Sequence, residues 1–167
     1  ASLSARWHRS IKEIPEENWE RLAGEKVIPF YQWGWLAALE TSGSICPREG
    51  WQPFHLALWR DDCAIAIAPL SLKGHSFGEF VFDQGFARLA MDLGLSYYPK
   101  FVGMSPLSPV EGYKFFIAEE EDNVEITMMM MQIIDRFAKQ NEIVSCNFLY
   151  VDPNWRPLAE KAGCAGW

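Results

Sequence analysis

The side chains that can do chemistry are densest between Ser71 and Asp83, in the segment Ser-Leu-Lys-Gly-His-Ser-Phe-Gly-Glu-Phe-Val-Phe-Asp. Between an apolar strand and an expected helix, this segment places a cation, an imidazole, a hydroxyl and two carboxylates: Lys73, His75, Ser76, Glu79 and Asp83. Strand ends that run into glycine-containing turns let side chains converge on a ligand while the scaffold stays rigid. The sequence therefore predicts that a site, if the chain has one, lies here.

Two of these residues are candidates for proton transfer. His75 or Glu79 can accept a proton, and Lys73 can pair with an anionic group. The alternative is an exposed turn whose polar side chains have no catalytic role. Two glycines at the spacing of Gly74 and Gly78 are too common to indicate a site, so they favour this alternative. Glu79 and Asp83 are four residues apart, so on a helix they would share one face and raise the pKa of one carboxyl. Solvated charges at a helix start are the equal alternative.

A second group of polar residues follows in Tyr97-Tyr98-Pro99-Lys100. It can supply a phenol donor from Tyr97 or Tyr98 and a cation from Lys100 at the start of the next strand, or it can be an aromatic pair packed under a loop. His55 lies inside a strand pattern, where a hydrogen-bonded structural histidine is the better interpretation.

Length and composition indicate one globular domain over residues 1–167. The chain has 49% apolar and 22% charged residues, enough to bury roughly 70% of its unfolded surface. Its net charge of -7, without a basic stripe, argues against DNA as a partner. No run of residues approaches a membrane span, and the first residues lack the apolar core of a signal peptide, so we expect a cytoplasmic protein.

Several common catalytic and binding motifs are missing from the sequence. The four cysteines, at positions 46, 63, 146 and 164, form no C-x-x-C pair and no cluster with histidine, so they are expected to be buried thiols and not metal ligands. The sequence contains no Gly-x-Ser-x-Gly, Walker or His-Glu-x-x-His motif. The loop from Pro106 to Gly112 is not the Gln/Arg-x-x-Gly-x-Gly/Ala loop that presents backbone N–H groups to a pyrophosphate, which argues against simple coenzyme A chemistry.

Strands and helices follow a recognisable order in the sequence pattern. The pattern predicts strands over 7–14, 53–60, 63–72, 99–104, 113–118 and 142–151, and helices after Pro15 and over 31–40, 82–93, 123–140 and 153–162. The strands before and after Arg60-Asp61-Asp62 form an antiparallel hairpin, and strands and helices alternate after residue 100. We expect an α/β fold of the α+β kind, with a mixed, largely antiparallel sheet flanked by helices.

The chain resembles the FemAB-like proteins, which are described as peptidoglycan biosynthesis or recognition proteins. The resemblance rests on Phe30 to Ser44, Gly50-Trp51-Gln52-Pro53 with His55, Pro69 to Lys73 through Phe82-Asp83, and Tyr97-Tyr98-Pro99-Lys100. The pattern differs at Gln84-Gly85-Phe86, where an aromatic-small-aromatic segment is usual, and at Leu107-Ser108, where Phe-Thr is commoner.

The resemblance implies a GNAT-like fold and makes this chain the N-terminal lobe of a longer, two-lobed protein, with a second GNAT-like lobe as its partner. It implies N-acyltransferase chemistry: an acyl or aminoacyl group passes to an amine of a peptide or cell-wall precursor, with acyl-CoA or aminoacyl-tRNA as the donor. His75 or Glu79 then accepts the proton of the amine, and Lys73, Ser76, Asp83, Tyr97, Tyr98 and Lys100 bind substrate. The alternatives are a lobe that only recognises peptidoglycan or a peptide, and an acetyl-CoA-dependent N-acetyltransferase.

Overall fold

The computed structural model describes residues 2–75, 77–79 and 83–166, and it consists of two four-stranded sheets flanked by helices. The first sheet has the strand order β1-β3-β4-β7 and the second has the order β2-β5-β6-β8. The strands are β1 Leu3–His8, β2 Trp51–Pro53, β3 His55–Arg60, β4 Cys63–Ala68, β5 Ser71–Lys73, β6 Lys100–Gly103, β7 Phe116–Ile117 and β8 Ser145–Phe148. This is the α/β architecture with mixed, largely antiparallel strand pairing that the sequence pattern predicts, although the strands are divided between two sheets.

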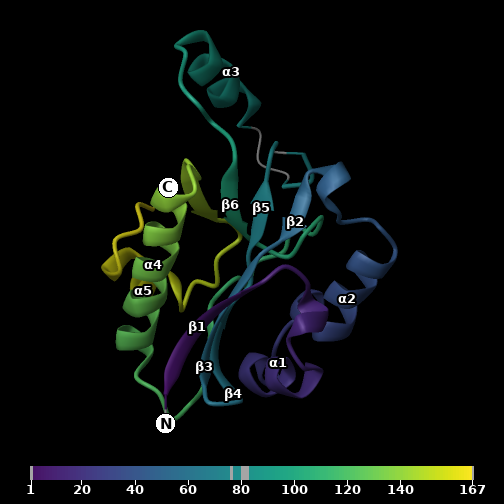
Figure 1. Cartoon of the computed structure of the whole chain (residues 1–167), viewed down its shortest axis with the longest axis vertical. Coiled ribbons are helices and arrows are strands. Elements are labelled where there is room, and N and C mark those ends of the chain that lie inside the picture. Colours follow the sequence, from purple (N-terminus) through teal and green to yellow (C-terminus); the bar gives the residue numbers. More distant parts are fainter. Residues whose placement is uncertain (1, 76, 80–82, 167) are drawn as a thin grey trace.

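The α-helices lie on both sides of the sheets. Figure 1 shows α1 and α2 on one side and α4 and α5 on the other, with α3 beyond the end of the second sheet. The helices are α1 Glu16–Ala23, α2 Trp33–Thr41, α3 Gln84–Asp92, α4 Asn123–Gln140 and α5 Arg156–Lys161, together with 3-10 turns at Ile11–Glu13, Pro29–Tyr31 and Pro47–Glu49. Among the described residues, no helix is both long enough and apolar enough to cross a membrane.

The expected hairpin forms the centre of the fold, but its second strand is divided. The strand predicted over 63–72 runs as β4 to Ala68, breaks at Pro69 and Leu70, and resumes as β5 in the other sheet. On the partner side, β2 and β3 divide in the same way at Phe54, whose N–H donates to the Leu70 carbonyl at 2.9 Å. Proline lacks the N–H that a continuous ladder needs, and the chain changes sheets at this point.

The other boundaries differ by a few residues or in the kind of element. The strand predicted over 7–14 lies earlier, as β1, because the chain turns into a 3-10 helix at Ile11. The strand predicted over 142–151 is shorter, and β8 is only half-buried. The helix predicted from Phe82 begins at Gln84, and Phe82 lies outside the described residues.

The aromatic residues build most of the core, as the composition suggests. Trp19 is fully buried between the helices and the first sheet, and its Nε1 donates to the Tyr31 carbonyl at 2.8 Å. His55 is a structural histidine: its Nδ1 accepts the Leu70 N–H at 3.1 Å, and burial lowers its pKa to about 3. The cysteines are less buried than expected, with Cys63 exposed and the other three intermediate.

Candidate functional site

The predicted site is organised by two lysines that face each other across a strand pair. Strand β5 ends at Lys73 and strand β6 begins at Lys100, and the two residues are register partners in the antiparallel pairing. The described residues between them, including α3, form an excursion that leaves the sheet at Lys73 and returns to it at Lys100. Both side chains are fully buried, at 0% and 1% exposure.

Two carboxylates from the excursion fold back onto these lysines. Glu79, itself 1% exposed, lies 3.4 Å from Lys73 Nζ and 3.0 Å from Lys100 Nζ. Asp83 accepts from Lys100 Nζ at 2.9 Å and from the Tyr97 hydroxyl at 2.8 Å. Lys73, Glu79, Lys100, Asp83 and Tyr97 therefore form one connected group, which we call the ion cluster. Glu79 and Asp83 do not share a helix face, since α3 begins only at Gln84, after Asp83.

Burial and pairing act differently on the two lysines. Burial lowers the pKa of Lys73 to about 8, although Glu79 opposes the shift. Burial also acts to lower the pKa of Lys100, but its hydrogen bonds to Asp83 and Glu79 outweigh that effect and raise it above the usual value. Burial and the hydrogen bond to Asp83 raise the pKa of Tyr97, so this phenol stays protonated and acts as a donor.

Two aromatic residues that were not singled out as site residues enclose the ion cluster. Lys73 Nζ lies 3.6 Å from the centre of the Trp51 ring, a close cation–π contact. The Tyr150 hydroxyl donates to the Glu79 carbonyl at 3.0 Å, which ties the excursion to the chain beyond β8. Trp51 stands in the Gly50 to Pro53 motif and was within reach of sequence reasoning. Nothing local in the sequence marks Tyr150.

His75 makes its contacts with the backbone. Its Nδ1 accepts the Phe77 N–H at 3.1 Å, and its Nε2 lies 3.0 Å from the Glu49 carbonyl. An N–H at Nε2 satisfies both contacts, so the neutral tautomer fits this geometry. The ring also covers Gly50, where an added Cβ would lie 1.9 Å from Nε2, so this close approach requires glycine.

The remaining predicted residues fall into two cases. Tyr98 lies at the rim of the ion cluster, with its ring centre 5.6 Å from Lys100 Nζ and 5.0 Å from the Tyr97 ring. Ser76 lies outside the described residues. The structure thus brings together Lys73, Glu79, Asp83, Tyr97, Tyr98 and Lys100, and it places His75 on the neighbouring turn.

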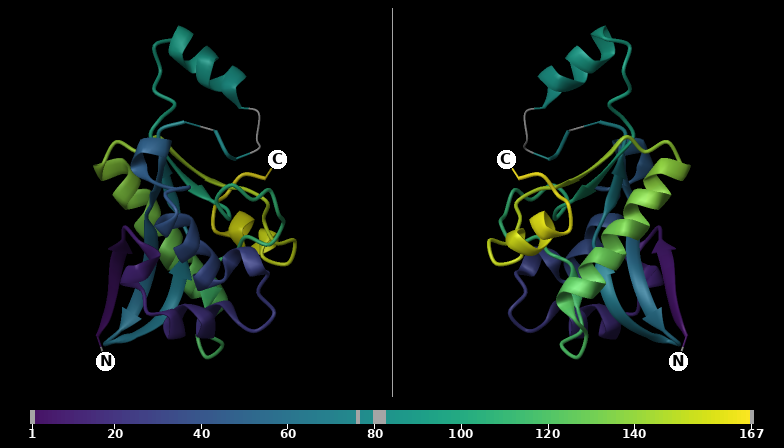
Figure 2. Two further views of the ribbon diagram at one scale, coloured as in Figure 1. Left: turned by 90° about the vertical axis from the view of Figure 1, so that its right-hand side faces the viewer. Right: turned by 90° about the vertical axis from the view of Figure 1, so that its left-hand side faces the viewer.

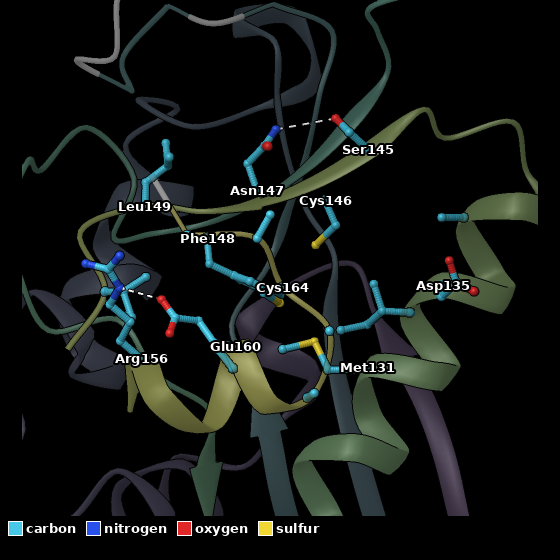
Figure 3. A pocket seen from close by; sticks show the side chains of 18 of the residues that line it. Met131, Asp135, Ser145, Cys146, Asn147, Phe148, Leu149, Arg156, Glu160 and Cys164 are labelled. Atoms are coloured by element: carbon cyan, nitrogen blue, oxygen red, sulfur yellow. Dashed lines mark hydrogen bonds and ion pairs between the residues drawn. The ribbon is translucent and has the colours of Figure 1, made fainter. Parts of the chain in front are cut away.

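A large open groove lies beside β8, away from the residues that the sequence pointed to. It has a volume of about 910 Å³ and is lined by α4, β8, α5 and the residues after α5. Figure 3 shows Cys146 and Phe148 directed from β8 toward α5, while Ser145 and Asn147 project from the opposite face of the strand. The two best-exposed cations of the groove are paired: Arg156 Nε lies 2.8 Å from Glu160, and Lys139 Nζ lies 2.8 Å from Asp135.

The groove continues toward the ion cluster. A neighbouring hollow of about 600 Å³ is lined by Tyr98, Ser96 and Pro99, and it shares Ala138, Lys139, Ile143 and Val144 with the groove. The two hollows therefore form a trough that begins at α5 and ends at Tyr98. A trough of this volume is of the size that binds small molecules or a short stretch of peptide.

Comparison with known proteins assigns this arrangement to a family. The model of the FemAB-like family, described as peptidoglycan biosynthesis/recognition, matches residues 10–167. The chain belongs to the FemAB-like family. This match supports a peptidoglycan-related role. A search among curated proteins gave no match.

The fold of this FemAB-like chain is similar to that of a GCN5-related N-acetyltransferase from Ralstonia eutropha JMP134. The two share 12% identity with a TM-score of 0.53, and the alignment covers 99% of this chain and 94% of that chain. At this identity the similarity concerns the fold alone, and it agrees with the predicted GNAT-like architecture.

Two features of the FemAB-like chain bear on donor binding. The segment before α4 reads Glu119-Glu120-Glu121-Asp122, and Asp122 caps the helix by accepting the Glu125 N–H at 2.8 Å. A helix N-terminus attracts anions, but here a carboxylate already occupies it. Where the β6–β7 stretch and β8 run side by side, the interior is filled by aromatic rings: Tyr113 stacks on Phe148, and Trp155 packs edge-on against both. Among the described residues, no group of three or more His, Cys, Asp or Glu side chains could hold a metal ion.

Proposed function

We propose that this chain is an N-acyltransferase-type lobe that holds the peptide of a cell-wall precursor while an acyl or aminoacyl group is transferred to an amine of that peptide. The observation that carries the proposal is the open trough beside β8 in a FemAB-like chain with a GNAT-like fold. The proposal also includes a second GNAT-like lobe beside this one and a cytoplasmic setting, where aminoacyl-tRNA or acyl-CoA is available as donor.

The backbone of β8 suits an extended peptide. Strand β8 ends its sheet, so one side of it pairs with β6 and the other faces the groove. The Val144 N–H donates to Pro99 and the Leu149 N–H donates to Gly103. N–H directions alternate along a strand, so about half of the backbone N–H groups of β8 point away from β6. An extended peptide can add to such an edge by main-chain hydrogen bonds, while pockets select its side chains.

The reaction has a simple balance. The nitrogen lone pair of the acceptor amine attacks the acyl carbonyl carbon, a C–N bond forms, and the C–O bond to tRNA or the C–S bond to coenzyme A breaks. The amine loses a proton, and His75 or Glu79 remains the proposed acceptor. For Glu79 this requires that its ion pairs with Lys73 and Lys100 loosen, and for His75 it requires release of Phe77 from Nδ1.

The ion cluster has a positioning role in this proposal. Lys100 and Asp83 hold Tyr97, and Tyr97 packs edge-on against Tyr98, whose side chain lines the end of the trough. Glu79 and Asp83 balance the charges of Lys73 and Lys100, so the ion cluster fixes the position of this wall and does not attract the substrate by a net charge.

A peptide-binding and turnover assay on the protein tests the proposal. We expect a muropeptide to bind and to accept an acyl group from one of a panel of aminoacyl-tRNA and acyl-CoA donors. Val144→Trp places a large ring in the middle of the trough, which Val144 lines, and should weaken peptide binding about tenfold or more, whereas Met128→Trp, at a 41% exposed site on α4 outside the trough, should leave binding unchanged. Equal affinity of both variants would contradict binding along β8, and undiminished turnover in both His75→Ala and Glu79→Ala would remove the catalytic assignment.

A lobe that recognises peptidoglycan without catalysis is the second candidate. It is favoured by the engagement of both proposed bases: Glu79 lies between two lysines, and His75 contacts backbone through both ring nitrogens. This candidate predicts that the muropeptide binds in the same groove and that no donor supports turnover.

Acetyl-CoA-dependent transfer has the least support. The acidic run from Glu119 to Asp122 repels a pyrophosphate at the start of α4, and aromatic rings fill the space between the neighbouring strands. Thermal stabilisation of the protein by acetyl-CoA would revive this alternative.

A further inference from the structure

Helix α3 is an apolar element with little of its own fold to cover it. Figures 1 and 2 show it standing away from the sheets, at one end of the longest axis of the molecule. None of its described residues is buried, and Phe86 and Leu89 are 64% and 54% exposed. A helix of this length is marginal in water without packing partners. The element therefore has the properties of an interaction surface that is unpaired in the isolated chain.

The apolar residues form a stripe with the spacing of a helix–helix contact. Phe86, Leu89 and Leu93 follow one another at intervals of three and four residues, so they lie on one face. Ala87 and Ala90 flank them, and small residues allow a second helix to come to the 8–10 Å that is typical of packed helices. Leu95, which is 63% exposed, extends the stripe beyond the end of the helix.

The charges of α3 favour a second copy of the chain over a lipid surface. The protein carries a net charge of -7, so two copies repel each other over most of their surfaces. Helix α3 carries one cation, Arg88, and one anion, Asp92, and is therefore locally neutral. Helices that bind anionic membranes have a polar face rich in lysine and arginine, which α3 lacks.

We propose that α3 forms a weak two-fold dimer by packing its stripe of Phe86, Leu89 and Leu93 antiparallel against the same stripe of a second copy. The exposed apolar area of the stripe and Leu95 is on the order of 400 Å² per copy. Two copies would bury about 800–1,000 Å² with the flanking alanines, which is the size of a weak, reversible interface. Because α3 lies at one end of the molecule, the remaining parts of the two copies extend in opposite directions and do not collide.

Sedimentation equilibrium of the protein from about 5 µM to about 500 µM tests this interface. We expect a monomer–dimer equilibrium with a dissociation constant of about 10–100 µM. Leu89→Asp should weaken it tenfold or more, because a buried carboxylate would face its own symmetry mate. Met128→Asp, an equally drastic change at a 41% exposed site on α4, should leave it unchanged. Circular dichroism shows whether each variant keeps its fold.

A cross-linking experiment tests the geometry independently of that variant. The two-fold axis passes close to Ala90, so Ala90→Cys should give a dimer joined through residue 90 of both copies with a short bismaleimide reagent, above the background of the parent cysteines. Met128→Cys should not. A protein that stays monomeric throughout, a dimer that Leu89→Asp leaves intact, or links from residue 90 to Cys146 or Cys164 in the groove would each overturn the proposal. Binding of neutral vesicles through α3 without self-association would overturn it as well.

Discussion

Glu79 lies between Lys73 and Lys100, at 3.4 Å from one ammonium group and 3.0 Å from the other. The two lysines are register partners, so their side chains leave neighbouring strands at the same level of the sheet. Without the carboxylate, two buried cations would face each other with only Asp83 to balance them. The chain after β5 therefore has to fold back so that Glu79 neutralises the two lysines, because unpaired buried charges would destabilise the sheet.

Replacing Glu79 with Gln should destabilise the protein strongly. The change leaves Lys73 without its carboxylate in a fully buried site, and breaking a buried ion pair on one side costs about 3–5 kcal/mol. Urea unfolding measures the loss. Glu120→Gln, at an exposed position, is the control and should stay within about 0.5 kcal/mol of the parent. A similar free energy of unfolding for both variants would show that the ion cluster contributes little to stability.

Lys73 should make the stability of the protein depend on pH between about 8 and its usual pKa. Burial lowers its pKa to about 8 in the folded state, so between that value and the unfolded pKa the unfolded chain binds more protons. Stability then rises with pH, by at most about 1.4 kcal/mol per pH unit for this one group. Lys100, whose pKa is raised, acts in the opposite sense and only at higher pH.

The difference in unfolding free energy between the parent and Lys73→Met isolates this effect, because all other titrating groups are shared. We expect the unfolding free energy of the parent to increase relative to that of the variant as the pH rises from about 8 to about 10. A constant difference across this range would mean that Lys73 keeps its ordinary pKa in the folded protein.

The cysteines should react with iodoacetamide in an order set by exposure and pKa. Cys63 is exposed and should react first. Burial and the neighbouring Cys164 raise the pKa of Cys146, so that little thiolate is present and alkylation is slow. Mass spectrometry of the digested protein gives the rate at each position, with the unfolded protein as the reference. Cys146 reacting as fast as Cys63 would show that β8 opens readily.

Asp122 should matter for stability and not for donor binding. Its side chain caps α4, and removing such a cap in Asp122→Ala costs about 1 kcal/mol. The melting temperature should fall in this variant, and acetyl-CoA should shift the melting temperature of neither the variant nor the parent. A clear shift of the melting temperature of the parent by acetyl-CoA would contradict our account of the acidic run from Glu119 to Asp122.

Elements with a strong local signal were predictable from the sequence. Helix α4 has the predicted bounds, Asn123–Gln140, because an amphipathic period extends over many residues and agrees with the helix start. The hairpin of β3 and β4 was predicted for similar reasons. Its passage into a second sheet at Pro69 was not, because a continuous apolar run does not reveal where a strand changes partners.

The site shows the same division between local and long-range information. The density of charge between Lys73 and Asp83 identified the residues that meet, but their burial depends on the pairing of Lys73 with Lys100, far along the chain. The part of Tyr150 in holding Glu79 and the groove beside β8 depend equally on distant segments. Periodicity and spacing cannot supply such contacts.

The crossing of the chain at Phe54 and at Pro69 makes the two sheets parts of one covalent frame. The same two segments supply strands to both sheets, and Tyr113 fastens the crossing by donating its hydroxyl to the Pro69 carbonyl at 2.7 Å. Separation of the strands in one sheet would displace the connected strands of the other sheet and break their hydrogen bonds. The molecule should therefore melt in a single cooperative transition, with no half-folded species populated on the way.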